Sequence, residues 1–157
     1  MATSYPNFKA AACHAASVFL NTAKTIEKAC DLIAEAARNG AKLIVFPESF
    51  IPGFPVWAAL QAPIQSHGFF AALAAEAVRL DGQELATLRM TARRHSVVVS
   101  IGVTEGTDTS VGCLWNSNIL IGADGSILNH HRKLEATAGN PDAGTAARVG
   151  STTKRGR

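Results

Sequence analysis

Glu48 is the first residue whose type and position suggest chemistry. It follows the apolar run at residues 43–46 and begins the turn ESFIPGFPVW. Open α/β sheets commonly bind ligands where a buried strand ends in this way. Four aromatic residues surround Glu48 in the sequence, so we expect its carboxylate to be partly desolvated, with the raised pKa of a general base: Phe46, Phe50, Phe54 and Trp57. The alternative is a glutamate that caps a helix or forms a salt bridge.

Lys133 is the second candidate. It lies in HHRKLEAT, residues 130–137, at the end of a predicted strand. A lysine ammonium in a closed site can stabilise negative charge that develops during a reaction. The alternative is a solvated cation on an edge strand, where lysine is common.

The other residue types with chemical potential show no useful spacing. The three cysteines, Cys13, Cys30 and Cys113, are far apart and form no CxxC pair, and the five histidines form no HExxH motif. We therefore predict neither a disulfide framework nor a metal site, and no cofactor. Each cysteine is expected to be a small buried apolar residue.

Composition and charge limit the possible classes of protein. With 157 residues, 47% hydrophobic and 17% charged, the chain is expected to form one folded domain. It has neither an apolar run long enough for a membrane span nor the features of a signal peptide, which predicts a cytosolic protein. The net charge of +3 comes entirely from residues 138–157, so residues 1–137 are neutral. This balance, with no aromatic residue in 138–157, argues against nucleic-acid binding.

The elements that must position these residues alternate between strand and helix. Apolar runs predict strands at 8–13, 42–46 and 97–103, and a hairpin around Asp124-Gly125. Helical spacing predicts one helix that begins at Asn21 or Thr22 and stops before Gly40. Alanine-rich and amphipathic segments predict two more helices, at 66–79 and from 81 or 82 onward. The expected fold class is α/β.

Residues 138–157 differ from the rest of the chain. Val149 is their only sizeable apolar residue, so we expect a disordered tail after a folded region at 1–137. Three interpretations are open: a natural flexible tail, a nucleic-acid-binding arm, or the product of a reading-frame change or premature stop. We favour the third, because of the departure from a family pattern described below.

Four motifs in order, FPESFIPGFPVW, GVTEG, LWNSNILIGADG and HHRKLEAT, resemble the nitrilase branch of the carbon–nitrogen hydrolase superfamily. The resemblance covers residues 9 to about 137. It implies the N-terminal half of a four-layer αββα sandwich, nitrile hydrolysis by a Glu-Lys-Cys triad, and no cofactor. By this resemblance Glu48 matches the general base and Lys133 matches the lysine that stabilises the tetrahedral intermediate.

The sequence departs from that pattern at the nucleophile. The family cysteine lies after the lysine, whereas no cysteine follows Cys113 here. Glu135 is too close to Lys133 to match the further glutamate of the family, and Glu105 in GVTEG is interpreted as a structural or site-lining residue. The nucleophile cysteine is therefore predicted to be absent.

These observations lead to two hypotheses. The first is a partial nitrilase whose parent converts a nitrile to a carboxylic acid and ammonia, with the chain as given inactive. The second is a non-catalytic interaction module that associates with an intact nitrilase oligomer. The resemblance also implies a homo-oligomer, and strands that expect cover on both faces predict an exposed apolar surface.

Overall fold

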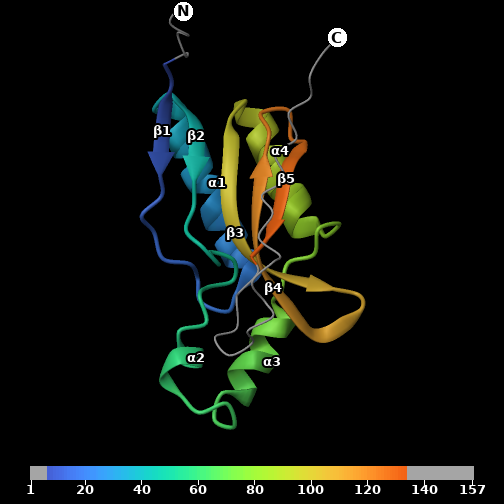
Figure 1. Ribbon diagram of the computed structural model, residues 1–157. Coiled ribbons are helices and arrows are strands. Elements are labelled where there is room, and N and C mark those ends of the chain that lie inside the picture. The colour runs from blue at the N-terminus through green and yellow to red at the C-terminus, as the bar shows by residue number, and fades with distance from the viewer. Residues whose placement is uncertain (1–6, 134–157) are drawn as a thin grey trace, which may run out of the picture.

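A five-stranded sheet organises the part of the chain that the structure describes (Figure 1). The computed structural model describes residues 7–133. The strands are β1 (Lys9–Ala12), β2 (Ala41–Val45), β3 (Val98–Thr107), β4 (Ser110–Ile121) and β5 (Ile127–Arg132), and they neighbour one another in that order. β1, β2 and β3 are parallel, whereas β4 and β5 are antiparallel to their neighbours. The predicted α/β class is confirmed.

Four helices accompany the sheet. The two long helices, α1 (Thr22–Arg38) and α4 (Gln83–His95), pack against each other and lie on the same side of the sheet. The short helices α2 (Trp57–Leu60) and α3 (His67–Ala75) lie beyond the carboxyl ends of β1 and β2, in the lower part of Figure 1. Within residues 7–133, no helix is long and apolar enough to cross a membrane.

Helix α1 begins where the sequence predicts. The Asn21 side chain accepts a hydrogen bond from the Lys24 backbone N–H at 2.9 Å, which satisfies one of the unpaired donors of the first turn. Ile26, Ala29 and Ile33 recur at helical spacing and are buried against the sheet. The predicted cap and the stop before Gly40 are confirmed, and Ile26 and Ile33 of the predicted apolar face are buried.

The core lies between the sheet and the two long helices. Alternate residues of β3, Val99, Ile101 and Val103, are fully buried there, together with Ile119 and Ile121 of β4. The opposite face of the sheet is more polar, since Ser100 and Asn118 form a hydrogen bond across it at 3.2 Å. Val45, on β2, remains 38% exposed. The sheet therefore has one face that forms the core and one that does not.

Most predicted elements are present with adjusted ends. The hairpin is confirmed: Gly125 adopts a φ of +81°, and Asp124 accepts a hydrogen bond from the Ser126 backbone N–H at 2.9 Å. The helix predicted to end at Arg79 ends earlier, because Val78 pairs with β3 instead, through hydrogen bonds to Thr104 and Gly106. The strand predicted at 97–103 continues to Thr107. The tail predicted at 138–157 lies outside the described residues.

The segment after β2 continues alongside β3 and carries Glu48 with it. Phe46 N–H donates to the Ser100 carbonyl at 2.8 Å, and Ile51 N–H donates to the Gly102 carbonyl at 3.2 Å. Between these contacts the chain crosses directly over Gly102. A Cβ atom at Gly102 would lie 2.5 Å from the Pro47 carbonyl oxygen and 2.8 Å from the Glu48 Cα. The position of Glu48 therefore requires a glycine, which has no Cβ atom, at residue 102.

We expect Gly102→Ala to destabilise the fold by about 2 to 3 kcal/mol, because the added methyl group meets backbone atoms that cannot rotate away. Urea unfolding at neutral pH measures the change. Gly112→Ala on β4 is the matched control, since no atom lies within 4 Å of its added Cβ; its stability should change by less than about 0.5 kcal/mol. Equal stability of the two variants would contradict the close approach.

Candidate active site

The structure brings Glu48 and Lys133 together, although 85 residues separate them. Glu48 Oε1 accepts hydrogen bonds from Lys133 Nζ and from Asn116 Nδ2, both at 2.6 Å. The Lys133 backbone N–H also donates to the Asn116 carbonyl at 2.8 Å. A carboxylate, an ammonium and an amide thus meet at the end of the sheet where β2 ends.

The prediction that the Glu48 carboxylate is partly desolvated, with a raised pKa, is wrong. Its side chain is 46% exposed, and that of Lys133 is 49% exposed. Phe46 and Phe50 do not surround the carboxylate, because both are buried in the core with ring centroids 5.0 Å apart. The hydrogen bond from Lys133, followed by that from Asn116, lowers the pKa of Glu48 instead of raising it. Glu48 is therefore an ionised, paired carboxylate, as in the salt-bridge alternative.

A cavity of about 460 Å³ lies beside this pair. Lys133 and Asn116 contribute to its polar wall, and Trp57, Phe70, Leu73 and Trp115 contribute to its apolar wall. Trp57 is held in place by ring contacts with Phe19 and Phe69, at centroid distances of 5.6 and 5.2 Å. A cavity with apolar walls and a few convergent polar groups suits a small organic molecule.

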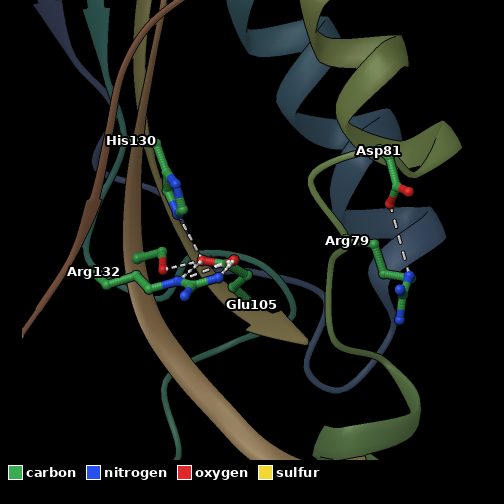
Figure 2. Close-up of polar contacts among 6 residues, drawn as sticks. Arg79, Asp81, Glu105, His130 and Arg132 are labelled. Atoms are coloured by element: carbon green, nitrogen blue, oxygen red, sulfur yellow. Dashed lines mark hydrogen bonds and ion pairs between the residues drawn. The ribbon is translucent and has the colours of Figure 1, made fainter. Parts of the chain in front are cut away.

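A second carboxylate, Glu105, lies on the core side of the sheet and is only 1% exposed. Figure 2 shows His130 and Arg132 converging on it. Its oxygens contact His130 Nε2 at 2.7 Å and accept hydrogen bonds from Ser117 Oγ at 2.6 Å and from the Arg132 guanidinium at 2.5 Å. Burial opposes the charge, but the bonds from Arg132, Ser117 and His130 outweigh it and lower the pKa of Glu105 to about 2. The geometry agrees with the structural role expected for Glu105.

None of the three cysteines, all of which lie in the described part of the chain, lines the cavity beside the Glu48–Lys133 pair. On β4, Ser117 bonds to Glu105 and Asn116 bonds to Glu48, whereas Cys113 lies where the pairing with β3 shifts its register. Cys113 is exposed near the start of that strand, so its expected burial is wrong. Cys13 and Cys30 are half-buried, and burial raises the pKa of both thiols.

Metal-ligand chemistry has no arranged site in the part of the chain that the structure describes. Its His, Cys, Asp and Glu side chains form no group of three or more that could hold a metal ion. The polar groups that meet at the cavity are instead a carboxylate, an ammonium and an amide.

The family model for carbon–nitrogen hydrolases matches residues 9–154. The chain belongs to the carbon–nitrogen hydrolase family. This match includes every described element and continues 17 residues past the boundary expected at residue 137. The resemblance inferred from the four sequence motifs is confirmed at the level of the family.

Among curated proteins, this chain is similar to nitrilases. It is 39% identical over 129 residues to an arylacetonitrilase of Hypocrea virens. The aligned region covers 82% of this chain and 38% of that protein. It is 37% identical over 131 residues to an aliphatic nitrilase of Rhodococcus rhodochrous, which covers 83% of this chain and 35% of that protein. The chain thus spans little more than a third of the length of these relatives.

Solved structures support the fold expected for the family. The C. elegans NitFhit protein superposes with a TM-score of 0.60 at 19% identity, over 79% of this chain and 27% of that chain. A carbon–nitrogen hydrolase from Helicobacter pylori G27 superposes with a TM-score of 0.55 at 21% identity, over 83% of this chain and 40% of that chain. The sheet and its helices therefore form a nitrilase-type α/β layer pair.

Asn116 was missed as a site residue by the sequence reasoning. It lies in LWNSNILIG, a segment used only to support the family resemblance. No local signal singled it out, because Ser117 and Asn118 follow it in the same strand. The Glu48 carboxylate is its partner.

The ionisation of Glu105 makes the stability of the fold depend on pH. The pKa of Glu105 is about 2 in the folded chain, below its ordinary value of 4.5. Its contribution to stability is therefore full above pH 4.5 and is lost as the pH falls towards 2. That shift corresponds to about 3 kcal/mol. We expect Glu105→Gln to lower the free energy of unfolding at pH 6, with the deficit shrinking towards pH 2.5.

Urea unfolding of both proteins at the two pH values measures this difference. Asp81→Asn is the control, because the Asp81 side chain is 84% exposed and should leave the pH dependence unchanged. A deficit for Glu105→Gln that stays constant between pH 6 and pH 2.5 would contradict the charged state assigned to Glu105.

Proposed function

We propose that this chain carries the base and lysine of a nitrile-hydrolysing site, with Glu48 as the general base and Lys133 as the group that stabilises the intermediate. The observation that carries the proposal is the contact of both side chains beside a cavity with apolar walls. The nitrilase names of the relatives support a nitrile as the substrate class.

The proposed chemistry assigns separate tasks to the two charges. A nitrile carbon is a weak electrophile and requires a strong nucleophile such as a thiolate. Glu48 would take the thiol proton as sulfur attacks, forming a covalent thioimidate. One water then releases ammonia to leave a thioester, and a second water releases the carboxylic acid. The Lys133 ammonium would offset the negative charge that develops at each addition step.

We further propose that the chain as given does not complete this reaction, since its sequence has no cysteine after Cys113. Cys113 is not proposed as a substitute, because it does not line the cavity beside Glu48 and Lys133. The proposed substrate is a small nitrile, without a cofactor.

Binding and turnover should separate in the purified chain. We expect phenylacetonitrile to shift the indole N–H signals of Trp57 and Trp115 in a ¹H–¹⁵N spectrum, because both rings line the cavity. Ammonia released from the same nitrile should stay at the level of a protein-free blank. Glu48→Ala should leave that level unchanged.

Two results would contradict this proposal. Indole signals that do not move up to the solubility limit of the nitrile would contradict a nitrile-binding cavity. Ammonia release that Glu48→Ala abolishes would contradict the absence of a nucleophile, and the source of the thiol would then have to lie within the 157 residues.

The second candidate, a non-catalytic interaction module, is favoured by one surface. Large apolar side chains are exposed along the segment that contains α2 and precedes α3, including Val56 at 52%, Leu60 at 79% and Ile64 at 88%. Exposed apolar side chains gathered in one segment commonly mark an interaction site. Such a surface suits association with a homologous chain.

We expect the chain to co-elute with an intact nitrilase on size-exclusion chromatography, with the mass measured by light scattering. Leu60→Glu with Ile64→Glu should abolish co-elution, because each places a charge in the apolar surface. Lys24→Glu, on the exposed side of α1, is the control for an added charge. A well-folded monomer that elutes separately would count against the interaction module.

A further inference from the structure

Glu105 and Lys133 lie near each other along the sheet but on opposite faces. Arg132 and Lys133 are consecutive, and side chains on a strand alternate between faces, so Arg132 reaches Glu105 while Lys133 reaches Glu48. The same arrangement occurs on β4, where Ser117 bonds to Glu105 and Asn116 bonds to Glu48. Two pairs of consecutive residues therefore connect the two carboxylates.

We propose that Glu105 is a positioning residue for the candidate active site, acting through Arg132 and Ser117 to hold Lys133 and Asn116 against Glu48. The inference rests on the proposed function, because it gives Glu105 a role in the geometry of the Glu48–Lys133 pair. Glu105 does not touch the pair, and its effect is transmitted by the backbone of β4 and β5.

Strand register makes this transmission direct. Ser117 is paired with Arg132 across the antiparallel ladder, and Glu105 is paired with Trp115 on the neighbouring strand. The Lys133 N–H donates to the Asn116 carbonyl immediately beyond the last pair. One buried carboxylate thus fixes three strands at the position where the active-site side chains emerge.

Because Glu105 is charged and buried, losing one of its hydrogen-bond partners is energetically unfavourable. A carboxylate that is 1% exposed has little water to replace a lost hydrogen bond, so Arg132 and Ser117 must stay in place while it is ionised. Arg132 is also held from its other side, since its guanidinium carbon lies 4.8 Å from the centroid of the Trp115 ring. In contrast, Lys133 and Glu48 are each about half exposed. Water therefore screens the Glu48–Lys133 ion pair more strongly than it screens the contacts of Glu105.

The direction of one pKa change distinguishes positioning from simple electrostatics. Glu105→Gln removes a negative charge and so leaves Arg132 uncompensated, which through Coulomb interactions alone would lower the pKa of Glu48. Loss of positioning has the opposite effect, because Lys133 moves away and Glu48 loses its strongest hydrogen bond. We therefore expect the Glu48 midpoint in Glu105→Gln to rise by at least ~0.5 pH unit, a change of about threefold in proton affinity.

The experiment follows the Glu48 side-chain carboxyl by ¹³C NMR as a function of pH, in the full chain and without substrate. Glu48→Gln assigns the signal, and Lys133→Met gives the midpoint when the lysine is lost altogether. Arg79→Gln is the matched control, since it breaks ion pairs with Asp81 (Figure 2) and Asp108 and removes no group that bonds to Glu105 or Glu48. The control should leave the Glu48 midpoint unchanged.

A folded Glu105→Gln protein whose Glu48 midpoint is unchanged or lower would overturn the proposal. If Glu105→Gln does not fold, Ser117→Ala decides, because it removes one hydrogen bond to Glu105 without changing the charge. A rise in the Glu48 midpoint supports positioning, and no rise overturns it. The titration needs no turnover, so a failure of nitrile binding or hydrolysis would leave this result interpretable.

Discussion

A charge placed in the core must keep its partners, and in this chain that constraint acts on Glu105. Its carboxylate is contacted by Ser117 from β4 and by His130 and Arg132 from β5. A one-residue slip of β5 would turn its side chains to the opposite face and leave Glu105 without two of its partners. The register of the antiparallel half of the sheet therefore depends on electrostatics as well as on apolar packing.

Glu48 and Glu105, on opposite faces of the sheet, show how burial changes the strength of hydrogen bonds to a carboxylate. Glu48 is bonded to a lysine and an amide, yet it is 46% exposed, so water screens the pair and competes for both partners. Glu105 has comparable contacts and is 1% exposed, so its bonds are made in a medium of lower polarity. Glu105 is therefore suited to fix geometry, whereas Glu48 remains accessible for exchange with a ligand.

The sequence predicted the elements better than the environments. Local signals were sufficient for α1 and for the hairpin, because a cap such as Asn21 and a turn such as Asp124-Gly125 act over a few residues. The meeting of Glu48 and Lys133 followed from a family resemblance and not from local pattern. The pKa of Glu48 was mispredicted because neighbours in sequence, Phe46 and Phe50, turn into the core while distant residues supply its contacts. Burial is a tertiary property, and the four nearby aromatic residues could not specify it.

The Glu48–Lys133 pair is about half exposed, so a surface that covered it would change the pKa of Glu48. Excluding water from Glu48 would disfavour its charged form, which raises the pKa, but it would also strengthen the attraction of Lys133, which lowers it. The balance depends on whether Lys133 keeps its position when water leaves. A lysine fixed through its neighbour Arg132 can hold the carboxylate ionised, whereas one that swings away leaves a buried carboxylate to take up a proton. The position of Arg132 on the core face of the sheet thus helps to decide whether Glu48 can act as a base on the opposite face.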